Sequence, residues 1–115
     1  MKAAKLLKDK VAAGQITTGA LATDLLWPGL VECLMRSGLD YLIIDQEHGV
    51  HDDKLVAEVC ALGRMVDFPV IVRPIDCAYA TIRQAIDRGP CGFLLPGIEA
   101  AQALAAAVTD GTLRA

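Results

Sequence analysis

Three ionisable residues follow one apolar segment of the chain within four positions. The run Tyr41-Leu42-Ile43-Ile44 leads directly into Asp45, Glu47 and His48. An imidazole titrates close to neutral pH, and a neighbouring carboxylate can hold one tautomer and raise the basicity of the ring. These residue types at this spacing indicate a proton-transfer site. The other interpretation is a surface histidine that makes only a loop hydrogen bond.

A second charged residue follows another apolar run. Arg73 comes directly after residues 69–72 and directly before Pro74. A guanidinium cannot be neutralised by losing its proton, so at the end of a buried strand it needs an anion. That anion is either a carboxylate such as Glu47 or a carboxylate or enolate oxygen of a substrate, and the residues alone leave both open.

Strands and helices must position these side chains, and both can be read from the apolar pattern. Four apolar runs predict strands over residues 16–21, 41–44, 69–72 and 92–95. Helices are predicted over residues 1–14, from Pro28, from a cap at Asp52 or Asp53, over 78–88 and over about 100–108. The alternation in units of about 25 residues predicts βα repeats.

Each predicted strand is a nearly unbroken apolar run, which indicates a parallel sheet buried on both faces. Two architectures fit. The length favours a flavodoxin-like doubly wound sheet, and the motifs described below favour the first half of a (β/α)8 barrel. In both, the carboxyl ends of the strands meet at one edge of the sheet. The residues expected at this edge are Thr23, Asp24, Asp45, Glu47, His48, Arg73 and Glu99.

Two further residues give weaker signals. His51 forms an H-x-x-H pair with His48, and together with Asp45 and Glu47 the pair can be drawn as a metal site, but such spacings are common by chance. Asp87 ends a predicted helix, where a carboxylate is by default solvated. The sequence has neither a GxGxxG nor a Walker A phosphate loop.

The composition points to one globular domain over residues 1–115. The chain is 54% hydrophobic and 22% charged, which argues against disorder. A net charge of −3 gives no electrostatic footprint for nucleic acid or an anionic membrane, so small molecules or copies of the chain are the expected partners. No apolar stretch reaches the roughly 18 residues of a membrane span, and no signal peptide is evident, so we expect a cytoplasmic protein. The four cysteines form no CxxC pair and are expected to be reduced thiols.

Several linked motifs, in order, resemble the N-terminal part of the HpcH/HpaI family of metal-dependent 2-oxo-acid aldolases. This family includes 4-hydroxy-2-oxoheptanedioate and 2-dehydro-3-deoxyglucarate aldolases, and the resemblance runs over about residues 2–108. The motifs that carry it are Ser37-Gly38-Leu39-Asp40-Tyr41-Leu42-Ile43-Ile44-Asp45-Gln46-Glu47-His48-Gly49, Pro69-Val70-Ile71-Val72-Arg73-Pro74, residues 82–89 and Gly92-Phe93-Leu94-Leu95-Pro96.

The resemblance implies a TIM-type barrel, of which this chain covers about the first four βα units. It also implies retro-aldol cleavage of a 4-hydroxy-2-oxo acid to pyruvate and an aldehyde. By matching position, His48 accepts the C4 hydroxyl proton and Arg73 stabilises the charge on the C2 oxygen. Asp87 falls where the family has an aspartate credited with raising the basicity of the histidine. Asp45 is the nearer candidate for orienting the imidazole, because a helix-end residue is expected at the opposite rim unless another subunit supplies it.

The chain also departs from the family pattern. The resemblance implies a divalent metal of the Mg, Mn or Co type, but the metal-binding glutamate and aspartate of the family come from later strands than this sequence contains. Glu47 is then at most an outer-shell contact. A tryptophan often found at the end of the first strand is absent, because Ala20 or Leu21 occupies its place and Trp27 comes too late.

Two hypotheses follow for this fragment of a barrel. The first is a metal-dependent aldolase lineage that is active only when the rest of the barrel is supplied. The second is a catalytically silent half-barrel that acts as an oligomerising or binding module. Unpaired hydrophobic strand edges favour self-association, so a homo-oligomer is expected in either case.

Overall fold

A four-stranded parallel sheet forms the centre of the computed structural model, which describes residues 1–98, 105 and 106. The predicted helix over 100–108 lies outside the described residues except for 105 and 106, which are helical, and Glu99 lies outside them too. The elements are α1 (Lys2–Ala12), β1 (Gly19–Ala22), α2 (Leu30–Arg36), β2 (Tyr41–Asp45), α3 (Asp53–Val66), β3 (Val70–Arg73), α4 (Tyr79–Asp87) and β4 (Gly92–Phe93).

The strand order decides between the two predicted architectures. The strands lie in the order β1-β2-β3-β4, and every neighbouring pair is parallel. A doubly wound sheet reverses its direction of winding at a switch point, whereas a (β/α)8 barrel adds each strand beside the previous one. The sheet therefore has the topology of half a TIM-type barrel, and the flavodoxin-like alternative is wrong.

The side chains of the strands alternate between two faces. The face toward the helices carries the core, in which Leu42, Ile44, Val70 and Val72 are all at most 2% exposed. On the other face, Leu21 pairs in register with Ile43, and Ile43 with Ile71. One step further along the same face, Asp45 pairs in register with Arg73. The strands therefore place a charged row above an apolar row.

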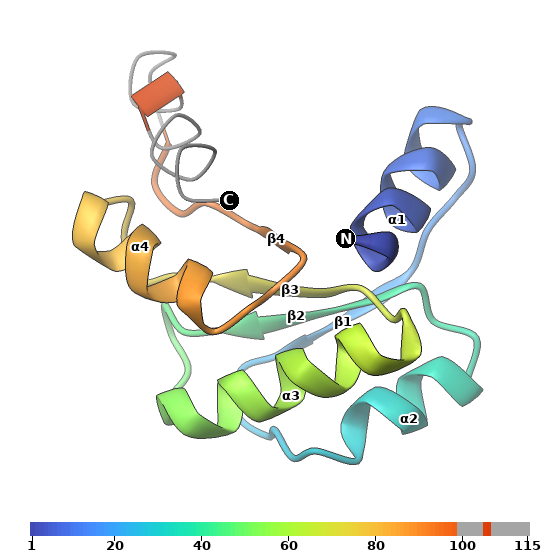
Figure 1. Cartoon of the computed structure of the whole chain (residues 1–115), viewed down its shortest axis with the longest axis horizontal. Helices are drawn as coiled ribbons and strands as arrows, with labels where there is room; N and C mark the ends of the chain where they lie inside the picture. Colours follow the sequence, from blue (N-terminus) through green and yellow to red (C-terminus); the bar gives the residue numbers. More distant parts are fainter. Residues whose placement is uncertain (99–104, 107–115) are drawn as a thin grey trace.

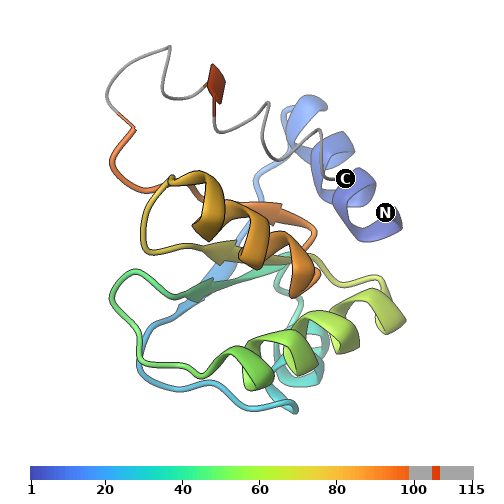
Figure 2. The ribbon, with the colours of Figure 1, turned by 60° about the vertical axis from the view of Figure 1, so that its left-hand side comes forward.

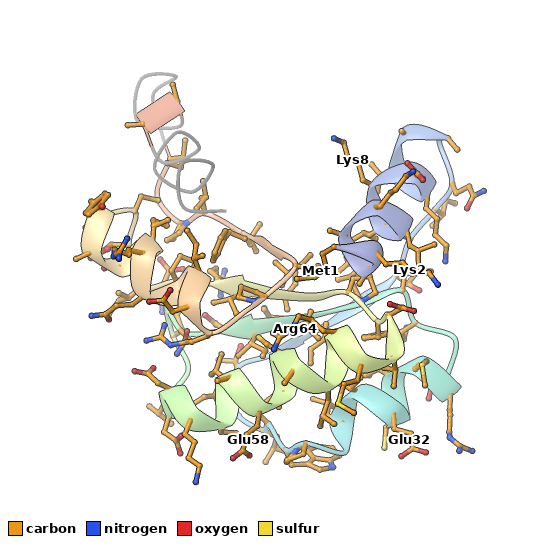
Figure 3. The ribbon with its side chains drawn as sticks, in the orientation of Figure 1. Met1, Lys2, Lys8, Glu32, Glu58 and Arg64 are labelled. Atoms are coloured by element: carbon orange, nitrogen blue, oxygen red, sulfur yellow. The ribbon has the colours of Figure 1, made fainter. Side chains whose placement is uncertain are left out.

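Helices α2 and α3 lie side by side along the core face of the sheet (Figures 1 and 2). Asp52 caps α3 by accepting a hydrogen bond from the Leu55 amide at 2.9 Å, so it fills the capping role predicted for Asp52 or Asp53. The residues of α3 that are buried against the sheet are Val56, Val59, Cys60 and Gly63. Leu55 and Leu62 flank this stripe and are half-buried. Figure 3 shows Glu32 and Glu58 on the outer sides of α2 and α3.

Helix α1 lies at the amino ends of the strands (Figure 1), away from the edge where the charged row lies. Lys10 holds it there through Asp40, whose carboxylate lies 2.8 Å from the Lys10 ammonium and accepts a hydrogen bond from the Thr18 amide at 2.9 Å. The hydrogen bond from Lys10 is the main reason why the pKa of Asp40 lies below its ordinary value. None of the described helices is long and apolar enough to cross a membrane.

Three elements differ in extent from the sequence prediction. β1 begins at Gly19 and not at Ile16, which is 93% exposed and does not pair. α2 begins at Leu30, because Pro28 and Gly29 form the turn that precedes it. β4 ends at Phe93, two residues earlier than predicted, although the Leu94 amide still donates to the Val72 carbonyl at 3.0 Å.

The four cysteines are free thiols, as predicted. Cys60 is 1% exposed on α3, and burial raises the pKa of its thiol to about 12. It packs as a small apolar side chain in the core and is protonated at neutral pH.

The core predicts a clear difference between two substitutions of the same type. Ile44→Ala removes a fully buried side chain of the core face and is expected to lower the free energy of unfolding by about 2 to 5 kcal/mol. Ile16→Ala removes a side chain that is 93% exposed and is expected to change it by less than about 0.5 kcal/mol. Urea denaturation followed by circular dichroism measures both. Equal losses in the two variants would contradict the assignment of the core face.

Candidate active site at the carboxyl edge of the sheet

Asp45 is the centre of the hydrogen-bond network at this edge. It is the last residue of β2, and its carboxylate is 0% exposed. Arg73, the last residue of β3, donates from Nε to Oδ1 at 3.1 Å and from Nη2 to Oδ2 at 2.7 Å. The register of the two strands produces this pairing, because Asp45 and Arg73 are direct neighbours in the sheet. A two-point contact of this kind fixes the plane of the guanidinium as well as its distance.

Three further donors complete the shell around the Asp45 carboxylate. The Thr23 hydroxyl, just beyond β1, donates to Oδ2 at 3.1 Å. The backbone amides of Glu47 and His48 donate to Oδ1 at 2.9 and 3.1 Å. Among the described residues, no buried side-chain nitrogen or oxygen lacks a partner. The buried charge is therefore fully satisfied, and it also fixes the backbone on which Glu47 and His48 stand.

The ionisation of the pair follows from these contacts. The hydrogen bonds from Arg73 hold the pKa of Asp45 far below its ordinary value, against the opposing effect of burial. The same contact raises the pKa of Arg73. Both groups are therefore charged across the physiological pH range.

His48 stands at the solvent side of this network. Its side chain is 69% exposed, and its Nε2 atom lies 3.4 Å from Oε1 of Glu47. The same Glu47 oxygen lies 3.4 Å from Nε of Arg73. Glu47 therefore bridges the arginine and the histidine, so that the imidazole and the guanidinium lie within one cluster.

This arrangement corrects one prediction about Asp45. Asp45 was expected to orient the imidazole of His48, but its one hydrogen bond with His48 comes from the backbone amide of that residue and not from the ring. Both of its oxygens already accept hydrogen bonds from Thr23, the Glu47 amide and Arg73. Glu47 is the carboxylate that lies against the ring.

Several residues that the sequence analysis singled out do not join the cluster. Asp24 and Asp87 are exposed, and no hydrogen bond or ion pair within the described part of the chain connects Asp87 with His48. His51 lies 2.9 Å from the Ala22 carbonyl through its Nε2 atom, so it links the segment before α3 to the end of β1. Glu99 lies outside the described residues.

The sequence reasoning missed Cys77. Its thiol donates to the Pro96 carbonyl at 3.3 Å, and burial raises its pKa, with further contributions from Asp76 and Glu47. It therefore joins the loop after β3 to the segment after β4 near the same edge. Its position four residues beyond Arg73 was the available signal, because residues that follow parallel strands gather at one edge.

The residues at this edge do not by themselves form a divalent-metal site. Within residues 1–98, 105 and 106, no group of three or more His, Cys, Asp or Glu side chains could hold a metal ion. Both carboxylate oxygens of Asp45 accept hydrogen bonds from Arg73, and the His51 ring contacts the Ala22 carbonyl. The metal site that the H-x-x-H pair suggested is therefore wrong for the described residues. Glu47 contacts His48 and Arg73, and its outer-shell position at a metal stays a prediction.

Comparison with known proteins finds aldolases that match most of this chain. A hydroxypyruvate/pyruvate aldolase of Paraburkholderia phytofirmans is 37% identical over 89 residues, which are 72% of this chain and 33% of that protein. A 5-keto-4-deoxy-D-glucarate aldolase of Salmonella paratyphi A is 31% identical over 104 residues, which are 90% of this chain and 40% of that protein. The solved HpcH/HpaI aldolase of Desulfitobacterium hafniense superposes with a TM-score of 0.83 at 27% identity, over 91% of this chain and 40% of the other. No family model matches the chain.

The chain resembles the N-terminal part of the HpcH/HpaI aldolases. This confirms the family resemblance and the half-barrel fold that the sequence predicts. The chain spans between 33% and 40% of the length of these three relatives. Their names describe aldolases, which supports a carbon–carbon lyase lineage for this HpcH/HpaI-like chain.

The Asp45–Arg73 pair predicts a pH-dependent stability. The pKa of Asp45 is lower in the folded chain than its unfolded value of about 3.9, so its charge stabilises the fold above that pH and the stabilisation is lost as the pH falls below it. Asp45→Asn is therefore expected to lower the melting temperature by several degrees at neutral pH, and the difference from the unchanged chain is expected to shrink below about pH 4.

Thermal unfolding at a series of pH values tests this. Asp9→Asn is the matched control, because Asp9 is exposed on α1, and it should leave the melting temperature unchanged. If Asp45→Asn lowered the melting temperature by the same amount at all pH values, the ionisation of Asp45 would not be the cause.

Proposed function

We propose that this chain supplies the proton-transfer and enolate-binding part of a cytoplasmic aldolase site. The reaction is metal-dependent retro-aldol cleavage of a 4-hydroxy-2-oxo acid to pyruvate and an aldehyde. The observation that carries the proposal is the cluster in which Asp45 fixes Arg73 and Glu47 joins Arg73 to His48 at the carboxyl edge of the sheet. The aldolase names of the relatives support the same reaction class.

In this proposal, His48 is the proton acceptor. Its imidazole is 69% exposed, so a substrate hydroxyl can reach it, and Glu47 lies at 3.4 Å to stabilise the imidazolium that forms. Removal of the C4 hydroxyl proton lets the electrons of that oxygen form the aldehyde carbonyl as the C3–C4 bond breaks. The electron pair of the broken bond becomes the enolate of pyruvate.

Arg73 is proposed to hold the enolate oxygen. Asp45 occupies its Nε and Nη2 atoms, while Nη1 has no hydrogen-bond partner within the described residues, and the side chain remains 21% exposed. The contact with Asp45 fixes the guanidinium before substrate binds. A donor that is already oriented stabilises developing charge without reorganising, which is worth about 3 kcal/mol for one such donor in known enzymes.

Asp87 remains a residue of the proposal through its matching position alone. Its exposed side chain at the end of α4 fits a role in which one subunit supplies Asp87 to His48 of another. Such a role would make a homo-oligomer part of the site.

The charge at this edge supports the requirement for a metal. Asp45 and Glu47 outnumber Arg73, so with a neutral His48 the described cluster carries a net negative charge, which repels a 2-oxo acid. A divalent cation of the Mg, Mn or Co type, when bound, would supply positive charge and Lewis acidity toward the keto oxygen of the substrate. Since the described residues do not form its site, we propose that the metal ligands come from a part of the barrel outside them.

Pyruvate release tests the aldolase proposal. The chain is assayed with 4-hydroxy-2-oxo acids and Mg²⁺, Mn²⁺ or Co²⁺ after the remaining part of the barrel is supplied from a related aldolase. His48→Ala is expected to lower kcat by roughly 100-fold or more because the proton acceptor is lost. Val50→Ala is the control in the same loop, because Val50 is 94% exposed and should retain full activity. If folded protein at high concentration released no pyruvate with any of the metals, the proposal would fail for this polypeptide.

A second candidate function is that of an oligomerising module without catalysis. The observation that favours it is the apolar row on the open face of the sheet, where Leu21 is 50% exposed on the edge strand β1. β4, at the other edge, pairs with β3 alone among the described strands. A second copy, related by a two-fold axis along the centre of the barrel, would pair its β4 with β1 of the first copy and its β1 with β4 of the first copy. These two pairings would close an eight-stranded barrel.

The molar mass in solution tests this second candidate. Light scattering coupled to size-exclusion chromatography should give twice the monomer mass, and Leu21→Glu should shift the chain toward the monomer because it places a charge on the open face. Ile16→Glu introduces the same charge outside the sheet and should leave the mass unchanged. A monomer at all concentrations would exclude this function.

A further inference from the structure

Three polar side chains form a separate cluster on the helix side of the segment that leads to His48. Gln46 directly follows β2, Asp53 is the first residue of α3, and Arg88 caps the end of α4. The Arg88 Nη1 atom donates to the Gln46 side-chain oxygen at 3.2 Å, and Arg88 Nη2 lies 2.9 Å from Asp53 Oδ2. The Gln46 amide nitrogen donates to Asp53 Oδ1 at 3.2 Å. Each pair of the three residues is thus in contact.

The charges of this cluster specify the orientation of the Gln46 amide. Its oxygen faces a guanidinium and its nitrogen faces a carboxylate, so each end of the amide dipole meets a group of opposite sign. The reversed amide would place like-signed atoms together at both contacts. The Arg88 side chain is 15% exposed, so water screens its contacts less than those of a surface arginine.

Gln46 lies between two residues of the candidate site along the chain. Asp45 precedes it and Glu47 follows it, and its own backbone amide donates to the Arg73 carbonyl at 2.9 Å. The Asp45 carboxylate therefore holds this segment from the open face of the sheet, and Arg88 holds it from the helix side. Packing does less on the helix side, because a hollow of about 280 Å³ lies there between α3 and α4, lined in part by Gln46, Asp53 and Arg88.

We propose that Arg88 is a positioning residue for His48. It does not touch the imidazole. Together with Asp53, it fixes the side chain of Gln46, and through Gln46 it limits the movement of the backbone at Glu47 and His48. The catalytic consequence rests on the proposed aldolase function, whereas the positioning itself can be measured without any activity.

Amide hydrogen exchange on the 115-residue chain, followed by NMR, tests the positioning. Arg88→Gln is expected to lower the protection of the Glu47 and His48 amides roughly tenfold, the size of one hydrogen bond to a charged group. Amides in the centre of β2 should change only with global stability. Arg88→Lys retains the charge opposite Asp53 and is expected to restore part of the protection.

Arg64→Gln is the matched control. Arg64, labelled on α3 in Figure 3, also joins α3 to the residues after α4, since its Nη1 atom donates to the Gly89 carbonyl at 2.8 Å. Within the described residues no hydrogen bond joins it to Gln46. If Arg88→Gln and Arg64→Gln lowered His48 protection equally, or only in proportion to global stability, the positioning role would be wrong.

The activity assay separates this inference from the proposed function. In protein that releases pyruvate, Arg88→Gln is expected to lower kcat more than it changes KM, because a displaced base affects the transition state more than substrate binding. Equal pyruvate kinetics in both proteins would refute a catalytic consequence of the positioning. If the unchanged protein released no pyruvate, the proposed function would fail, and hydrogen exchange would still decide the role of Arg88.

Discussion

The buried ion pair between Asp45 and Arg73 is the interaction on which the rest of the edge depends. A fully buried carboxylate is costly unless charged and polar donors satisfy it, and the structure supplies them from the ends of β1, β2 and β3 together. Each donor is thereby fixed as well. The guanidinium of Arg73 is oriented, the end of β1 is drawn toward β2 through Thr23, and the backbone at His48 is set. The same ion pair therefore satisfies a buried charge and fixes the guanidinium that is proposed to hold the enolate oxygen.

The sheet makes this pair unavoidable. Parallel strands in consecutive order place residues of equal height side by side, so the apolar row of Leu21, Ile43 and Ile71 lies under the charged row of Asp45 and Arg73. The helices cover the other face of the sheet. Within the charged row Asp45 is buried and Arg73 is 21% exposed, whereas the His48 side chain beyond it is 69% exposed.

Much of the fold could be predicted from the chain itself, because apolar runs of strand length and capping residues are local signals. The four strands, the cap at Asp52 and the shared edge of Arg73, Asp45 and His48 follow from such signals. The ends of β1 and β4 did not, since an apolar residue such as Ile16 pairs only where a neighbouring strand reaches it. The sequence also left open whether the anion that pairs with Arg73 is a carboxylate such as Glu47 or a substrate. In the structure the main partner of Arg73 is the Asp45 carboxylate, and Glu47 lies further away.

The sequence by itself determined the residue types at the carboxyl edge and the alternation of strands and helices that gathers them, because both depend on neighbours along the chain. Only the tertiary structure decided how those residues divide their roles. Register between β2 and β3 assigns Asp45 to Arg73, which leaves Glu47 for His48 and removes Asp45 from the imidazole. Contacts across 28 residues of sequence, such as this ion pair, or 42, such as Arg88 with Gln46, arise from strand pairing and helix packing. No local pattern encodes those distances.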